Sequence, residues 1–207
     1  MINIALPKGR LVNKVYNLFE KIGYENKELL EDNRKLVFEN KDKNVRYLIV
    51  KPSDVGIYVE KGVADIGIVG KDILLENNHD IYELLDLKFG KCRVCMASVQ
   101  GYKEDIERRL RVATKYVNIS KNYFNSINRD VEIIKLNGSI ELAPILNLSD
   151  VIVDIVETGS TLRENNLTVI KEIIDYISAR LIVNKVSYKF KNELIKTIVK
   201  NIEEVLW

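Results

Sequence analysis

Three kinds of residue or segment are scarce in this chain of 207 residues, and each scarcity excludes a class of function. The two cysteines, Cys92 and Cys95, would face opposite sides of a strand, and His79 is the only histidine. Zinc needs about four ligands, so we interpret the thiols as apolar side chains. A hydrolase triad also lacks candidates. No apolar run reaches the ~18–20 residues of a membrane span, and Lys8 follows too soon for a signal peptide. We therefore expect a cytoplasmic protein without membrane contact.

An excess of charge of one sign is also lacking. The sequence carries 32 Lys and Arg against 30 Asp and Glu, a formal net charge of +2. This balance gives no overall attraction to nucleic acid or to an anionic membrane, so any anion site must be built locally. The 46% apolar and 30% charged residues are ordinary for a globular chain. The length suits one domain or two small ones.

Strands and helices are predicted to alternate along the chain. The expected strands are Ile2–Leu6, Tyr47–Val50, Asp65–Val69, Phe89–Val99, Arg111–Ala113, Val131–Leu136 and Val151–Ile155. The expected helices begin at Leu11, Pro52 and Gly70, or span Tyr116–Asn125, Ile140–Leu146 and Phe190–Leu206. Residues 168–177 fit a helix face, but their β-branched side chains favour a strand. This order indicates an α/β architecture, with ligand sites at the carboxyl ends of strands.

The most informative segment is a buried strand that leads into a hydroxyl-rich turn. The strand carries Asp154, and the turn is Thr158-Gly159-Ser160-Thr161. Successive backbone N–H groups, three hydroxyls and a glycine that permits close approach are what a phosphate group requires. The carboxylate would suit ribose hydroxyls or a magnesium ion. The spacing alone equally allows a turn that only caps the next element.

A second segment places two cations, Lys8 and Arg10, at a strand-to-helix turn around Gly9. Cations oppose the helix dipole there unless an anionic ligand compensates, so the turn is a candidate anion site. The alternative is two solvated surface cations. The segment 67–72 lacks the spacing of a phosphate-binding P-loop. His79 lies in a polar turn, and we interpret it as a solvated loop residue.

Six segments together resemble the ATP phosphoribosyltransferase family, the first enzyme of histidine biosynthesis. They are 5–10 (ALPKGR), 54–60 (DVGIYVE), 64–72 (ADIGIVGKD), 113–116 (ATKY), 136–144 (LNGSIELAP) and 154–165 (DIVETGSTLREN). The resemblance covers nearly the whole chain in the correct order. It implies a fold similar to type II periplasmic binding proteins, with two lobes of mixed, mostly parallel sheets and an active site in the cleft between them. Residues 1–98 and 180–207 would form lobe I, on the ATP side, and residues 99–179 lobe II, with the loop for 5-phosphoribosyl 1-diphosphate (PRPP).

The resemblance also implies a reaction, in which adenine N1 of ATP attacks the anomeric carbon of PRPP and diphosphate leaves. The PRPP-binding residues would be Glu141, Asp154, Thr158, Gly159, Ser160 and Thr161. The ATP-binding residues would be Lys8, Gly9, Arg10, Lys51 and Asp72, and the catalytic residues Arg10, Arg34 and Lys8. The cofactor would be Mg²⁺, held mainly by substrate phosphates rather than by a metal site of the protein. Arg34 enters through the resemblance only.

The chain departs from the family pattern at three positions. Asn147 stands where the family usually has Gly, Ser149 where Ala is common, and Gly56 where Pro is usual. None removes a charged group, so we expect effects on loop geometry only. The chain ends soon after its last helix, which resembles the short form of the family. That form implies a regulatory subunit similar to histidyl-tRNA synthetase, a hetero-octamer with it, and a dimer of the isolated chain.

Two other functions remain compatible with parts of this pattern. A solute-binding module on the same fold would bind a small anion without chemistry, but a secretory leader is expected there. A phosphoribosyltransferase for a different base would share the Thr158–Thr161 turn, but the N-terminal segments disfavour it.

Overall fold

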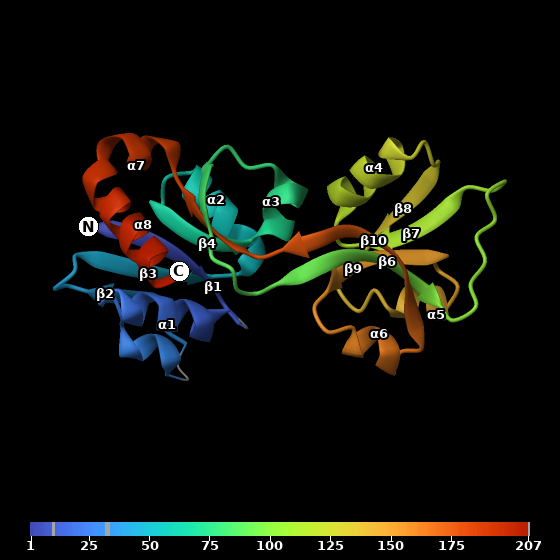
Figure 1. The fold of residues 1–207 in the computed structure, drawn as a ribbon, viewed down its shortest axis with the longest axis horizontal. Coiled ribbons are helices and arrows are strands. Elements are labelled where there is room, and N and C mark those ends of the chain that lie inside the picture. The colour runs from blue at the N-terminus through green and yellow to red at the C-terminus, as the bar shows by residue number, and fades with distance from the viewer. Residues whose placement is uncertain (10, 32–33, 207) are drawn as a thin grey trace. The chain divides into compact units, whose positions relative to one another are not determined.

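The alternating elements form two units in the computed structural model, which describes residues 1–9, 11–31 and 34–206 (Figure 1). Unit 1 holds residues 1–74, 78–90 and those from Ser178 onward, and unit 2 holds residues 75–77 and 91–177. The chain thus passes between the units after residues 90 and 177, whereas the resemblance implied lobe boundaries after residues 98 and 179. Residues 92–99 form a strand that pairs on both sides with strands of unit 2, whereas Ser178 Oγ donates to Asp86 Oδ1 of unit 1 at 2.6 Å.

Unit 1 has a six-stranded sheet with the order β2-β3-β1-β4-β11-β5. Its strands are β1 Ile2–Pro7, β2 Val37–Asn40, β3 Val45–Val50, β4 Ile66–Gly70, β5 Tyr82–Asp86 and β11 Ala179–Val183. Its helices are α1 Val12–Lys21, α2 Val55–Glu60, α7 Lys185–Phe190 and α8 Asn192–Leu206, with 3₁₀ turns at Lys27–Leu30 and Pro52–Asp54. Helix α3, Lys71–Asn77, begins in unit 1, and its last three residues belong to unit 2. Helices α1 and α8 pack on one face of the sheet, and α2 and α3 on the other.

Unit 2 has a five-stranded sheet with the order β10-β6-β9-β7-β8. Its strands are β6 Cys92–Val99, β7 Leu110–Thr114, β8 Val131–Lys135, β9 Val151–Val156 and β10 Leu167–Ile177. Helix α4, Val117–Ser126, covers one face, and the short helices α5, Leu142–Ile145, and α6, Ser160–Glu164, cover the other. Cys92 packs on the α4 side and Cys95 on the α5 and α6 side, which confirms that the two thiols face opposite sides.

The strand pairings are mixed, as expected, but they are not mostly parallel. Among the pairings that the described residues form, four are parallel and five antiparallel. One antiparallel pairing is the hairpin β2–β3. The other four involve β6, β10 or β11, the strands next to the points where the chain passes between the units. The parallel sets β3-β1-β4 and β9-β7-β8 lie together within each sheet, so their carboxyl ends meet at one edge.

The predicted elements are otherwise confirmed, apart from small shifts at their ends. The ambiguous segment 168–177 is part of strand β10, which pairs antiparallel with β6 at the end of the unit 2 sheet. Within the ranges that the structure describes, no helix is both long and apolar enough to cross a membrane.

The packing of His79 contradicts its interpretation as a solvated loop residue. Its side chain is only 8% exposed and lies over Gly56, where an added Cβ would stand 2.2 Å from the imidazole Cδ2. The departure at position 56 therefore has a physical reason, because a side chain there would displace the ring. The sequence could not reveal this, since the two residues meet only in the folded chain.

The departure at Asn147 also has a local explanation. Asn147 has φ of 58°, a left-handed conformation that Asn tolerates better than most residues other than Gly. Its Oδ1 accepts from Arg111 Nη2 at 2.9 Å, so the side chain gains a partner that glycine could not offer. Arg111 also donates to Asp150, a buried carboxylate that accepts from Arg108 as well. Ser149 is buried and its Oγ has no hydrogen-bond partner among the described residues, so nothing in the structure explains its hydroxyl.

Candidate active site

The candidate phosphate site begins where β9 ends. The buried strand delivers the loop at residues 157–159, and α6 follows at Ser160. Thr158 Oγ1 lies 3.0 Å from Ser160 Oγ, and the Ser160 N–H donates to Thr158 Oγ1 at 3.4 Å. The hydroxyls of Thr158 and Ser160 and the Ser160 N–H are thus gathered just beyond the carboxyl end of the strand.

Two features favour glycine at position 159. Its φ of +74° is left-handed, and an added Cβ would lie 3.2 Å from Arg163 Nη1, which would have to shift slightly. The guanidinium of Arg163 folds back over the turn and donates to the Thr158 carbonyl at 3.0 Å. Sequence reasoning missed Arg163 as part of this site, because one arginine on a short helix gives no signal of its own.

The two residues predicted to bind the ribose, Asp154 and Glu141, lie in segments on the same face of the sheet as the turn. Ile152 and Val156, two residues before and after Asp154 on β9, both pack in the cluster under α5 and α6, so Asp154 faces that side too. Glu141 precedes α5, and its neighbour Ile140 packs in the same cluster. The Asp154 Oδ1 accepts the Ile155 N–H at 2.8 Å, and Asp154 and Glu141 are both half-buried residues. The structure therefore brings Glu141, Asp154 and the Thr158–Thr161 turn to one face of unit 2.

The candidate cations of unit 1 gather at the carboxyl edge of its own parallel strands. Pro7 at the end of β1 pairs with Val50 at the end of β3, and the Lys8 N–H donates to the Val50 carbonyl at 2.8 Å. Lys8 and Lys51 therefore follow adjacent strands at the same edge, and both side chains are exposed. Gly9 has φ of +104°, which explains the glycine at this turn. Arg10 lies outside the described residues.

Arg34 reaches the same edge from a different segment. It lies in an exposed stretch just before β2, and the Ile49 N–H donates to the Leu36 carbonyl at 2.8 Å. Because β2 runs antiparallel to β3, its start lies at the end of β3. A pocket of about 180 Å³ opens beside this edge, and it is lined by Lys8, Val12, Leu29, Glu31, Lys35, Leu36, Phe38 and Ile49. Lys35 and Glu31 are polar lining residues that sequence reasoning missed.

Asp72 is placed differently from the other predicted ATP-binding residues. It lies in the first turn of α3, directly after β4, and is only 8% exposed. Its carboxylate turns back toward Gly70, where an added Cβ would lie 2.2 Å from Asp72 Oδ1. The backbone position is at the predicted edge, but the side chain is much less accessible than Lys8 or Lys51.

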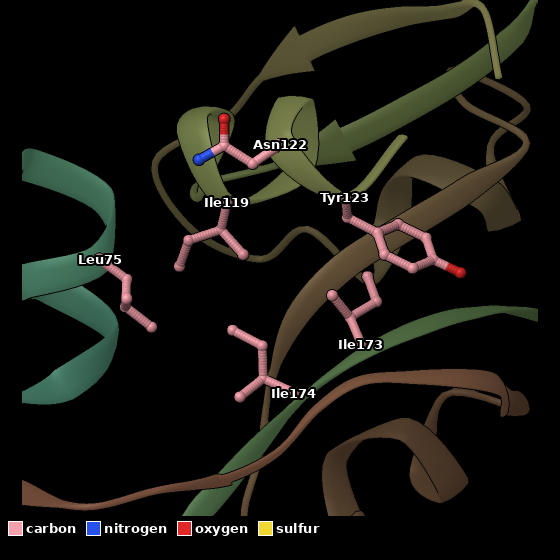
Figure 2. A pocket seen from close by; sticks show the side chains of 6 residues that line it. All are labelled: Leu75, Ile119, Asn122, Tyr123, Ile173 and Ile174. Carbon is pink, nitrogen blue, oxygen red and sulfur yellow. The ribbon is translucent and has the colours of Figure 1, made fainter. Parts of the chain in front are cut away.

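A larger pocket lies in unit 2 but does not fit a charged ligand. Figure 2 shows its side chains, which come from the end of α3, from α4 and from β10. The pocket has a volume of about 300 Å³ and is lined by Leu75, Ile119, Asn122, Tyr123, Ile173 and Ile174. These residues include no charged group, and four are aliphatic. A phosphate would lose its hydration there without a compensating donor set, so this pocket is not part of the candidate site.

The carboxylates of the candidate site do not by themselves form a site for a resident metal ion. Within residues 1–9, 11–31 and 34–206, no group of three or more His, Cys, Asp or Glu is arranged to hold one. Asp154 and Glu141 supply carboxylate oxygens, the ligand type that Mg²⁺ prefers, but Mg²⁺ commonly uses one or two carboxylates together with substrate phosphates. The residues present fit an ion that is shared with a phosphate ligand.

Comparisons with known proteins agree on one family. The family model described as ATP phosphoribosyltransferase matches residues 51–204. An ATP phosphoribosyltransferase of Brachyspira hyodysenteriae is 98% identical over 206 residues, which cover 100% of both chains. One from Bacillus cereus is 54% identical over 203 residues, covering 98% of this chain and 96% of the relative.

Two solved structures are similar in fold. An ATP phosphoribosyl transferase (HisG:HisZ) complex from Thermotoga maritima contains a chain with a TM-score of 0.86 and 39% identity, covering 100% of this chain and 98% of that one. A substrate-binding protein of an amino acid ABC transporter has a TM-score of 0.61 and 11% identity, covering 99% and 92%. At that identity the second likeness concerns the fold alone, and it agrees with the expected two-lobed α/β fold.

Proposed function

Because this chain belongs to the ATP phosphoribosyltransferase family, we propose that it catalyses the first step of histidine biosynthesis with the residues at its two sheet edges. Adenine N1 of ATP forms a bond to the anomeric carbon of PRPP, and the bond from that carbon to diphosphate breaks. The products are phosphoribosyl-ATP and diphosphate. The single observation that carries the residue assignment is the grouping of a phosphate-type turn with two carboxylates on one face of unit 2.

Unit 2 binds PRPP in this proposal. The N–H groups and hydroxyls of Thr158, Gly159, Ser160 and Thr161 receive the 5-phosphate, because Gly159 opens the backbone to close approach. Asp154 and Glu141 accept hydrogen bonds from the ribose hydroxyls, which fixes the ring while positive charge develops at its anomeric carbon. Two carboxylates on the same face also favour that charge electrostatically.

Unit 1 binds ATP and supplies cations. Lys8, Arg10 and Arg34 stabilise the charge that develops on the leaving diphosphate, and Lys8, Gly9, Arg10, Lys51 and Asp72 hold ATP. The edge formed by Lys8 and Lys51 supports this assignment because both side chains are exposed there. The substrate phosphates, with Asp154 as a carboxylate ligand, would hold Mg²⁺, and the ion would supply charge neutralisation of the phosphates. The chain's own residues orient the ribose and the nucleotide.

The fold alone would equally support a solute-binding protein, since the likeness to the ABC-transporter protein is of that kind. Direct measurement separates the two functions. Purified chain, ATP, PRPP and Mg²⁺ are mixed, and phosphoribosyl-ATP is followed by its absorbance. We expect product that depends on both substrates. The assay is run with and without a regulatory partner. If either substrate binds but no product forms in both cases, the result would instead support a binding module.

Replacing Arg34 tests the cationic edge of unit 1. We expect Arg34→Ala to lower kcat more than it raises either KM, because charge on the leaving group develops in the transition state. Arg34→Lys should restore only part of the rate, since a point charge does not reproduce paired N–H contacts. Arg46→Ala is the matched control, because Arg46 lies in unit 1 and pairs on the surface with Glu39. Normal single-turnover chemistry in Arg34→Ala would remove Arg34 from the catalytic set.

Regulation provides a further test. The related Thermotoga maritima protein was solved as a HisG:HisZ complex, and we propose that this chain also works with such a regulatory subunit in a hetero-octamer and forms a dimer alone. Histidine should then leave the isolated chain fully active, because allostery needs a second site with different affinity for two states. Titration of histidine into the isolated chain, with phosphoribosyl-ATP formation as the signal, measures this. Saturable inhibition without a partner would contradict the proposal.

A further inference from the structure

The proposed PRPP site has an electrostatic imbalance. Its assigned side chains are two carboxylates and three hydroxyls, and Glu157 and Glu164 flank the turn. A phosphate monoester carries about −1.5 to −2 charge at neutral pH. Backbone N–H groups compensate part of this charge, but helix α6 has only five residues, so its dipole offers little. A cation of unit 2 should therefore contact the 5-phosphate.

The geometry points to Arg163 as that cation, and we propose that its guanidinium binds the PRPP 5-phosphate while it holds the Thr158–Thr161 turn in shape. This inference rests on the proposed function, because it assumes that the turn receives the 5-phosphate. Nη1 of Arg163 donates to the Thr158 carbonyl at 3.0 Å. The same atom lies 3.2 Å from the position where a Cβ on Gly159 would stand.

Two features make this arrangement suited to an oxyanion. A guanidinium has five N–H donors in a planar fork, so one bond to Thr158 leaves donors for phosphate oxygens. The bond to the carbonyl also fixes the group in place before the substrate arrives, which lowers the entropy lost on binding. Gly159 is then needed as much for the approach of Arg163 as for its own backbone conformation.

Another arginine near the turn is less suited to this role. Arg93 pairs in register with Val156 at the end of β9, but its guanidinium forms an ion pair with Glu172 of β10. That pairing already compensates its charge. The Arg163 side chain instead donates to a neutral carbonyl, and this bond does not compensate its positive charge.

The test uses two inhibitors that separate the ends of PRPP. Ribose 5-phosphate carries only the 5-phosphate, and inorganic diphosphate represents the leaving group. For Arg163→Gln we expect Ki for ribose 5-phosphate and KM for PRPP to rise about tenfold to a hundredfold. Ki for diphosphate, KM for ATP and kcat should stay within about twofold, because the 5-phosphate does not react. For Arg163→Lys, Ki for ribose 5-phosphate and KM for PRPP should lie between the values for Arg163→Gln and the unmodified enzyme.

Controls separate this inference from the proposed function. Arg109→Gln is the matched variant, because Arg109 is an exposed arginine of unit 2 that pairs with Asp130. Thr161→Ala probes the turn itself. If Thr161→Ala weakens ribose 5-phosphate binding and Arg163→Gln behaves like Arg109→Gln, the inference about Arg163 is wrong and the turn assignment stands. If neither variant changes that Ki, the assignment of the turn fails as well. Equal losses for both inhibitors in Arg163→Gln would also overturn the inference.

Discussion

Gly159→Val should weaken PRPP binding by about a hundredfold or more and leave ATP binding within about twofold. Valine is strained at a φ of +74°, and its Cβ would press on Arg163 Nη1 at 3.2 Å. The turn would then lose both its backbone shape and its nearest cation. Calorimetric titration of each substrate measures the two affinities.

Gly101→Val is the matched control for this variant. Gly101 also has a left-handed φ, +79°, and lies in unit 2, but an added Cβ there would meet no atom within 4 Å. Both variants carry the strain of valine in this conformation, so both should lose some stability, whereas Gly159→Val alone should lose PRPP affinity. Equal PRPP affinities in the two variants would contradict the assignment of the turn.

Asp150→Ala should lower the free energy of unfolding by about 2–3 kcal/mol at neutral pH, less than the 3–5 typical of a fully buried pair. The Asp150 side chain is 4% exposed and accepts from Arg108 Nη2 at 2.6 Å and from Arg111 Nη2 at 2.8 Å. The expected loss is smaller than in a fully buried pair because the side chains of Arg108 and Arg111 are 49% and 29% exposed. Water can therefore hydrate their charges when the carboxylate is removed. Urea unfolding measures the difference. The control is Asp130→Asn, which removes an exposed ion pair with Arg109 and should lower the free energy of unfolding by under about 1 kcal/mol.

The same carboxylate predicts how this difference depends on pH. Burial raises the pKa of Asp150, but hydrogen bonds from Arg111 and Arg108 outweigh burial and hold the pKa well below its usual range. A depressed folded-state pKa gives stability that is fully present above the unfolded pKa of about 3.9 and is lost as the pH falls through the folded value. The stability gap between the natural chain and Asp150→Ala should therefore be constant above about pH 5 and shrink below about pH 4. A gap that stays constant down to pH 3 would contradict the role of the ionised carboxylate.

The sequence predicted those parts of the site that depend on local order along the chain. Asp154 and the Thr158–Thr161 turn follow one strand, so their grouping needed only the strand and the turn that ends it. Lys8 and Lys51 follow two strands, and the parallel pairing of those strands made them neighbours.

Features that depend on contacts between distant segments could not be predicted. His79, in the loop after α3, meets Gly56 of helix α2 only through packing, and no periodicity marks that contact. The role of β6 in unit 2 follows from its pairing with β9 and β10, which come later in the chain. Arg163 was overlooked for another reason, because a single arginine on a short helix carries no signal until its guanidinium is seen against the turn.

The central claim is that PRPP binds at the Thr158–Thr161 turn, and hydrogen exchange followed by mass spectrometry tests it most directly. Amides that bind a phosphate exchange more slowly when the ligand is present. We expect PRPP with Mg²⁺ to slow exchange in peptides that cover residues 156–165, and ATP alone to leave those peptides unchanged. Slower exchange with PRPP only in peptides of unit 1, or no change in residues 156–165, would contradict the account.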